Sequence, residues 1–197
     1  MTSIRIESNT KKEIGVAILA GGRSLRMGEP KAELILCEDG RKETFLEHMC
    51  AQFAMYKHRF ISINDTQEYC YPGYEQVIDE YAGIGPLGGI VSVLRRSGTS
   101  AVLFIGCDMP LFTSTAAEYL IDNWDGSPIC YSVVDGCRQP LAAIYTKDCI
   151  QSIEKQIMRG DYKLGLLIDS MDSQAVDMSG FAECYLNINT AEDYRKL

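Results

Sequence analysis

Two glycines, two arginines and a lysine lie close together near the N-terminus of this chain. Gly21 and Gly22 lack a Cβ atom, so the backbone can turn sharply there and lie close against a ligand. Backbone N–H groups in such a turn, flanked by Arg23, Arg26 and Lys31, would form a cradle for a polyphosphate. The alternative is a glycine-rich surface turn whose basic side chains are simply solvated.

The spacing of the glycines excludes two familiar phosphate-binding loops. A P-loop carries Lys and Ser or Thr directly after its last glycine, whereas Gly28 is followed by Glu29 and Pro30. A dinucleotide-binding fingerprint has alternating glycines, whereas Gly21 and Gly22 are adjacent. The segment is therefore a different kind of phosphate-binding loop, or it is not one at all.

A carboxylate follows the most apolar run of the chain, residues 101–106. Asp108 is poorly placed there for a structural role, and beside a polyphosphate its charge would repel the ligand unless a cation lay between them. Magnesium is typically held by one or two carboxylates together with substrate phosphates and water. The sequence therefore predicts Asp108 as a magnesium ligand, and the alternative is a helix cap.

Two further polar residues fall at the ends of predicted strands, which is where open α/β sheets bind their ligands. Asn64 follows the predicted strand 60–63, and Asp79 precedes a loop with four glycines and a proline at residues 83–89. An acceptor at Asp79 could read the N–H edge of a nucleobase or a ribose hydroxyl. The alternative is an ordinary aspartate in a turn.

A pair of amides lies near the C-terminus. Asn187 and Asn189 are two residues apart on a predicted strand, 185–189, so their side chains would share one face while Ile188 points the other way. Two amides on one face beside a ligand site could bind a second substrate. Alternatively, Asn189 caps the last helix.

Strand and helix patterns alternate along most of the chain, which predicts an α/β fold with a largely parallel sheet. The turn Asp135-Gly136 joins two strand-like runs and so predicts an antiparallel part. Thr44 and Glu47 match a capping box at the start of a helix. The predicted strands are 16–19, 60–63, 77–79, 101–106, 129–134, 138–145, 175–177 and 185–189. The predicted helices are 45–57, 87–96, 113–124, 148–159, 162–168 and one that starts at residue 190.

Length, charge and hydropathy limit the class of protein. The chain has 197 residues and a formal net charge of −8, which argues against a nucleic-acid surface because phosphate backbones attract basic patches. No window approaches the ~20 apolar residues of a membrane span, so we expect no membrane contact. We expect residues 1–13 to be a flexible tail and residues 14–197 to form a single domain.

Eight cysteines are scattered along the chain without a Cys-x-x-Cys pair. The first residues lack the apolar core of a signal peptide, so we expect free thiols in a reducing cytoplasm. A bridge between Cys130 and Cys137 is disfavoured. A two-residue turn would place Val134 opposite Cys137 and Cys130 opposite Leu141, which keeps the two sulfurs apart.

Five motifs of this chain recur, in the same order, in one known family. They are Leu-Ala-Gly-Gly-x-Ser-x-Arg-Met-Gly-x-x-Lys at 19–31, Gly-Pro-Leu-Gly-Gly at 85–89, Cys-Asp-Met-Pro at 107–110, Gln-Pro-Leu at 139–141 and Asn-Ile-Asn-Thr at 187–190. Over essentially residues 14–197, the chain resembles the molybdenum cofactor guanylyltransferases, which make molybdopterin guanine dinucleotide. Gly21 together with the Gly-Pro-Leu-Gly-Gly motif resembles the guanine-selecting enzymes of this group, whereas the related cytidylyltransferases usually carry alanine at the position of Gly21.

The resemblance implies a Rossmann-like three-layer αβα nucleotidyltransferase fold with a mostly parallel mixed sheet. It implies transfer of GMP from GTP to the terminal phosphate of molybdopterin or the molybdenum cofactor, with release of pyrophosphate and with Mg²⁺ as cofactor. Proteins that deliver or accept the molybdenum cofactor would be partners. The alternatives are a related nucleotidyltransferase that uses CTP or a sugar-phosphate acceptor, and a non-catalytic GTP-binding protein.

The resemblance also assigns the site residues. The implied catalytic residues are Lys31, Arg26 and Asp108, of which Asp108 would hold the metal. The implied nucleotide-binding residues are Leu19, Ala20, Gly21, Gly22, Lys31, Asn64, Asp79, Gly85, Gly89 and Asp108. The implied pterin-binding residues are Asn187, Asn189, Gln139 and Pro140.

Overall fold

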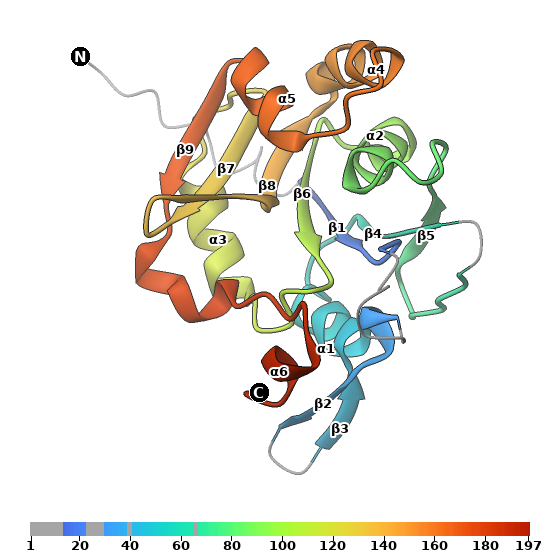
Figure 1. Ribbon diagram of the computed structural model, residues 1–197, viewed down its shortest axis with the longest axis vertical. Coiled ribbons are helices and arrows are strands. Elements are labelled where there is room, and N and C mark those ends of the chain that lie inside the picture. The colour runs from blue at the N-terminus through green and yellow to red at the C-terminus, as the bar shows by residue number, and fades with distance from the viewer. Residues whose placement is uncertain (1–13, 23–29, 39–40, 65–66) are drawn as a thin grey trace.

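The computed structural model describes residues 14–22, 30–38, 41–64 and 67–197. A seven-stranded sheet in the order β5-β4-β1-β6-β8-β7-β9 runs through the molecule (Figure 1). Every strand of this sheet runs in one direction except β8, which is antiparallel to both of its neighbours. The strands are β1 (Gly15–Leu19), β4 (Arg59–Ile63), β5 (Glu75–Ile78), β6 (Ala101–Gly106), β7 (Ile129–Val134), β8 (Cys137–Thr146) and β9 (Ser173–Asp177).

Helices pack on both faces of the sheet, each face with its own buried cluster of apolar side chains. In β1, Val16 and Ile18 belong to one cluster while Ala17 and Leu19 belong to the other, as the two-residue period of a strand requires. One face packs against α1 (Phe45–Gln52) and α3 (Ser114–Asn123), and the other against α2 (Pro86–Arg96), α4 (Ile150–Met158) and α5 (Leu164–Ser170). The predicted three-layer αβα class with a mostly parallel mixed sheet is confirmed.

The central strand β6 fixes the position of the predicted metal ligand. All six of its residues are buried, and it lies between β1 and β8. Because β1 and β6 are parallel, their carboxyl ends lie side by side, and the Cys107 N–H donates to the Leu19 carbonyl (3.2 Å). Asp108 therefore emerges next to the glycine-rich loop that follows β1, at the edge where doubly wound sheets bind ligands.

The hairpin of β7 and β8 departs from the simple register that its two-residue turn predicts. The turn pairs as expected, but Cys130 lies opposite Ile144 and not opposite Leu141. The register shifts between residues 131 and 132. Pro140 has no N–H to donate to the ladder, so we attribute the shift to a bulge of β8 at this residue.

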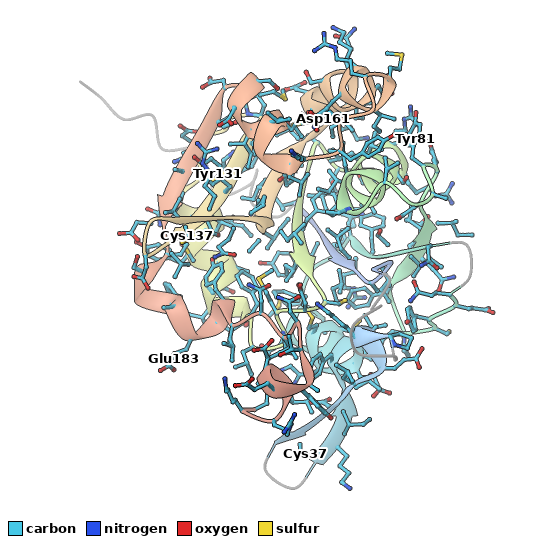
Figure 2. All side chains as sticks on the ribbon, in the orientation of Figure 1. Cys37, Tyr81, Tyr131, Cys137, Asp161 and Glu183 are labelled. Atoms are coloured by element: carbon cyan, nitrogen blue, oxygen red, sulfur yellow. The ribbon has the colours of Figure 1, made fainter. Side chains whose placement is uncertain are left out.

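The eight cysteines are free thiols, as the sequence predicts. Burial raises the pKa of the Cys50, Cys107 and Cys130 thiols to about 12, so these groups stay protonated and unreactive. Cys37 and Cys137 are exposed and lie at well-separated edges of the molecule (Figure 2).

The predicted strand at residues 185–189 is wrong. Ser179–Tyr185 form the 3-10 helix η4, and the chain then crosses the end of the sheet without joining it. Ile188 is fully buried, and its N–H donates to the Asp108 carbonyl (2.8 Å). The alternation of polar and apolar residues at 185–189 thus reflects the burial of Ile188, and not pairing with a neighbouring strand.

The segment around α1 shows both the success and the limit of local signals. Thr44 and Glu47 make the predicted capping box, but α1 ends at Gln52 and not near residue 57.

No helix in the described part of the chain is long and apolar enough to cross a membrane. The sequence did not predict the hairpin of β2 (Ile35–Glu38) and β3 (Arg41–Thr44), which projects from the body (Figure 1). The remaining short elements are η2 (Lys31–Glu33), η3 (Lys147–Cys149) and α6 (Ala191–Tyr194).

Candidate active site

A cavity of about 320 Å³ opens at the carboxyl ends of β1, β4, β5 and β6. Its size suits a small ligand such as a nucleotide, and it lies where the strand order reverses direction across the sheet. Most of the residues predicted to bind nucleotide line it together: Leu19, Gly21, Gly22, Lys31, Asn64, Asp79, Gly85 and Asp108.

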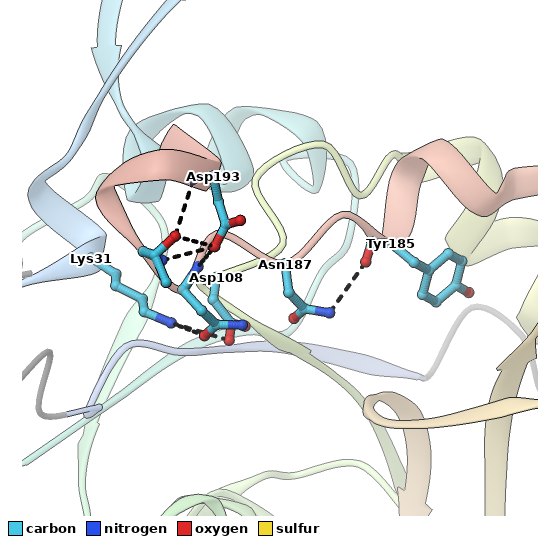
Figure 3. Close-up of polar contacts among 7 residues, drawn as sticks. Lys31, Asp108, Tyr185, Asn187 and Asp193 are labelled. Carbon is cyan, nitrogen blue, oxygen red and sulfur yellow. Dashed lines mark hydrogen bonds and ion pairs between the residues drawn. The ribbon is translucent and has the colours of Figure 1, made fainter. Parts of the chain in front are cut away.

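The charged end of the cavity is built by Lys31 and Asp108. The Lys31 ammonium lies 3.4 Å from Asp108 Oδ2 and 2.6 Å from Asn189 Oδ1 (Figure 3). Both charged side chains are largely buried, with 18% and 19% of their surface exposed. A cation and an anion that share a cavity wall in this way suit a ligand that carries both phosphates and a metal ion.

Asp108 Oδ1 is buried and accepts no hydrogen bond from any residue that the structure describes. A buried oxygen of this kind is costly unless a ligand or a cation satisfies it. Gly106 provides the space for this carboxylate, because a Cβ atom on Gly106 would lie 2.5 Å from Asp108 Oδ1.

We therefore expect Gly106→Ala to lower turnover on the order of 100-fold, because displacing a catalytic group by about an ångström can slow a reaction by that factor. The crowding should also lower the free energy of unfolding by about 1–3 kcal/mol. Gly98→Ala is the matched control, since a Cβ there would meet no atom within 4 Å. Initial rates and thermal melts of both variants check this, and an unchanged rate for Gly106→Ala would show that Asp108 does not need its present position.

The other end of the cavity is built around Asp79. Its Oδ1 accepts a hydrogen bond from Ser62 Oγ (2.8 Å), and its backbone N–H donates to the Ile63 carbonyl (2.9 Å). Burial raises the pKa of the Asp79 carboxyl to about 6, while the Ser62 hydrogen bond acts in the opposite direction. A half-buried carboxylate with this environment suits a ligand that offers N–H donors.

Gly21 lies against this carboxylate. Asn64 Nδ2 donates to the Gly21 carbonyl (3.1 Å), which fixes the start of the loop. A Cβ atom on Gly21 would lie 3.3 Å from Asp79 Oδ2 and 3.1 Å from the Asn64 backbone nitrogen. An alanine in this place would crowd the end of the cavity that holds Asp79.

The first turn of α2 forms another part of the cavity wall. Gly85 and Pro86 line the cavity, and Gly85 has φ +74°, which a glycine adopts without strain. A helix N-terminus favours anions, so this turn suits a phosphate. Gly89 and Ala20, both predicted to bind nucleotide, are buried and do not line the cavity. Gly89 packs behind it, where a Cβ atom would collide with Ser62 Oγ.

The residues predicted to bind the pterin fall into two groups. Asn189 contacts Lys31, and the Asn187 amide donates to the Tyr185 carbonyl (3.2 Å). Thr190 and not Asn189 caps α6, so the capping alternative for Asn189 is wrong. Gln139 and Pro140 lie on β8 outside the cavity lining, next to Leu141, which does line it.

Sequence reasoning missed several residues of the cavity wall. Ser62 carries the clearest signal that could have revealed it: it is a polar residue inside the apolar strand that ends at Asn64. The wall residues that were not predicted are Ser62, Ala82, Gly83, Pro86, Gly106, Cys107 and Leu141.

Comparison with known proteins decides which family this geometry represents. Residues 16–175 match the model of the MobA-like NTP transferase domain. The chain belongs to this family. It is 30% identical over 195 residues to the probable molybdenum cofactor guanylyltransferase of Carboxydothermus hydrogenoformans, covering 94% of this chain and 95% of that relative. It is 31% identical over 188 residues to the molybdenum cofactor guanylyltransferase of Syntrophotalea carbinolica, covering 91% and 88%.

A solved structure shows that the fold agrees as well. Molybdopterin-guanine dinucleotide biosynthesis protein A from Archaeoglobus fulgidus has a TM-score of 0.78 at 23% identity, covering 93% of this chain and 96% of that one. At this identity the likeness shows the fold alone. The family model and the curated relatives confirm the resemblance seen in the motifs, and this MobA-like NTP transferase is an enzyme of the nucleotidyltransferase class.

The residues of this MobA-like NTP transferase fit a magnesium ion held mainly by its substrate. In the described residues, no group of three or more His, Cys, Asp or Glu side chains could enclose a metal. A single carboxylate with a buried, unsatisfied oxygen at the phosphate end is instead the donor set that Mg²⁺ uses when phosphates and waters supply its other ligands. Arg26, predicted to act in catalysis, and Arg23 lie outside the described residues, as does the predicted tail 1–13.

Proposed function

We propose that this nucleotidyltransferase transfers GMP from GTP to the terminal phosphate of molybdopterin or the molybdenum cofactor. The supporting observation is the polarity of one cavity, which has Lys31 and Asp108 at one end and the Asp79 carboxylate beside Gly21 at the other. Phosphates suit the first end. Guanine suits the second, because its ring and exocyclic N–H groups are donors to a carboxylate.

The reaction joins two anions, so the work of the protein is alignment and charge stabilisation. A terminal phosphate oxygen of the acceptor attacks the α-phosphorus of GTP. The new O–P bond forms, the bond from the α-phosphorus to the bridging oxygen breaks, and pyrophosphate leaves. Lys31 stabilises the charge that develops on the leaving pyrophosphate, and Arg26 is predicted to share this role. Asp79 holds the base, which keeps the α-phosphorus in reach of the acceptor.

Asp108 is the residue that would hold Mg²⁺ against the triphosphate. When bound, the ion neutralises phosphate charge and acts as a Lewis acid on the phosphoryl oxygens. The orphaned Oδ1 of Asp108 and the absence of a Cβ on Gly106 are the features of this chain that support the assignment.

Product analysis tests the proposed function directly. The enzyme is incubated with Mg²⁺ and GTP, CTP or UTP, each with molybdopterin or a sugar 1-phosphate, and pyrophosphate and the organic product are measured. We expect a product, molybdopterin guanine dinucleotide, only in the incubation that combines GTP with molybdopterin. Preferred use of CTP or of a sugar phosphate would replace the proposal with one of the related nucleotidyltransferase activities.

The Asp79 carboxyl makes guanine binding depend on pH. Its pKa of about 6 means that the carboxylate, which accepts the guanine N–H groups, is lost as the pH falls through 6. We expect the affinity for GTP to fall roughly ten-fold between pH 7 and pH 5, one ten-fold step for each unit below the pKa. Calorimetry measures the Kd of GTP at each pH for the wild-type protein and for Asp79→Asn. The ratio of the two Kd values cancels the effect of protonating GTP itself, because that effect is common to both proteins. An equal pH dependence in both proteins would exclude Asp79 as the base acceptor.

The partners and the compartment follow from the same proposal. An enzyme that modifies molybdopterin must receive it from, and pass its product to, proteins that deliver or accept the molybdenum cofactor. Eight free thiols favour the reducing cytoplasm as the place of action.

A further inference from the structure

The segment that carries the two asparagines is held firmly against the active site. Ile188 is fully buried, and its N–H donates to the carbonyl of Asp108 itself (2.8 Å). On the other side, the Asp193 carboxylate accepts the N–H groups of Asn189 (3.0 Å) and Thr190 (2.8 Å) in the capping box of α6. The backbone of Asn189 is thus fixed from both directions.

From this fixed backbone the Asn189 amide reaches Lys31. The distance from Lys31 Nζ to Asn189 Oδ1 is 2.6 Å, shorter than the 3.4 Å from Lys31 Nζ to Asp108 Oδ2 (Figure 3). Lysine has a flexible four-carbon stem, so its ammonium needs a partner to hold one position. A neutral acceptor holds it without cancelling its charge, and the charge stays available to a phosphate.

Asn187 does something different, although it lies only two residues away. Its side-chain hydrogen bond goes to the Tyr185 carbonyl of its own segment, and the amide points along the chain away from Lys31 (Figure 3). Within the residues that the structure describes, Asn187 and Lys31 share no hydrogen bond.

We infer that Asn189 is a positioning residue that presents Lys31 to the triphosphate, a role that Asn187 does not share. The inference rests on the proposed function in one respect, namely that Lys31 meets the phosphates of the nucleotide. It changes the assignment of Asn189 from the acceptor to the nucleotide side of the site.

Nucleotide binding without acceptor tests this role of Asn189. The Kd of GTP with Mg²⁺ is measured by calorimetry for wild type, Asn189→Ala, Asn187→Ala, Lys31→Ala and the double variant Lys31→Ala/Asn189→Ala. We expect Asn189→Ala to raise the Kd about five- to ten-fold, the loss expected for one hydrogen bond in the upper part of the ordinary range. Asn187→Ala should leave the Kd of GTP within about two-fold, because Asn187 makes no hydrogen bond to Lys31 in the described residues.

The double variant tells positioning from a merely structural effect. If Asn189 acts through Lys31, Asn189→Ala should change the Kd less than about two-fold once Lys31 is absent. An effect of equal size in both backgrounds would overturn the inference, as would equal effects of Asn187→Ala and Asn189→Ala on GTP binding.

Two matched helix caps provide a second test. Thr190→Ala removes the cap beside Asn189, and Thr44→Ala removes the corresponding cap of α1, which has the same hydrogen-bond pattern. We expect only Thr190→Ala to weaken GTP binding, and equal losses would count against the inference. A wild-type protein that binds CTP and not GTP would contradict the proposed function alone, and the same variants would then decide the inference with CTP.

Discussion

Replacing Asp108 with alanine should reduce turnover roughly 1,000-fold while the protein stays folded. The bound metal ion supplies several kcal/mol of charge stabilisation in the transition state, and each 1.4 kcal/mol corresponds to a ten-fold rate change. Asp108 Oδ1 accepts no hydrogen bond from the described residues, and the Lys31 ammonium, which loses its contact with Oδ2, keeps the Asn189 acceptor, so we expect the fold to survive. Pyrophosphate release under saturating GTP, acceptor and Mg²⁺ measures the loss, and a thermal melt measures the fold.

The controls for this prediction come from the same chain. Asp108→Asn keeps the shape but not the charge, and we expect it to be nearly as inactive as Asp108→Ala. Asp172→Ala removes an exposed carboxylate just before β9, at the opposite end of the sheet, and should change the rate less than two-fold. If Asp108→Asn kept most of the activity at low Mg²⁺, the assignment of the metal to Asp108 would be wrong.

Lys31→Ala should cost on the order of 2–4 kcal/mol of transition-state stabilisation, by analogy with the loss of an oxyanion donor. The Lys31 side chain is largely buried and lies at the phosphate end of the cavity, so little solvent screens its charge. The larger part of the loss should fall on kcat, because the charge on pyrophosphate develops during the reaction, and the rest on the Kd of GTP, which should rise at least as much as in Asn189→Ala.

A lysine on the far surface supplies the comparison. Lys155→Ala removes an exposed cation on α4 and should leave kcat and KM unchanged. Lys31→Arg keeps the charge but replaces a compact ammonium with a wider fork, and we expect it to recover only part of the rate. A Lys31→Ala enzyme with a normal kcat and a raised KM would limit Lys31 to binding the ground state.

The sequence predicted the parts of the site that depend on strand order. The apolar run of β6 and the glycine-rich turn after β1 each have strong local signals, and the carboxyl ends of parallel strands must meet at one edge. Asp108 and Gly21 therefore line one cavity, as expected, together with Asp79 at the end of β5.

What the sequence could not predict depends on long-range geometry. The contact between Lys31 and Asn189 joins residues 158 positions apart, and no local pattern specifies it. The strand expected at 185–189 failed for the same reason, because Ile188 gains its burial at the end of the sheet and not beside a partner strand. The raised pKa of Asp79 follows from burial, which only the folded structure shows.

The path of the last segment across Asp108 has a consequence for how the enzyme matures. A ribosome releases Asn189 158 residues after Lys31, so a growing chain could form the sheet before this lysine is held in place. Contacts of such large sequence separation form late, because the chain must first close a long loop. Catalytic competence therefore waits for residue 189, which is synthesised after every strand of the sheet.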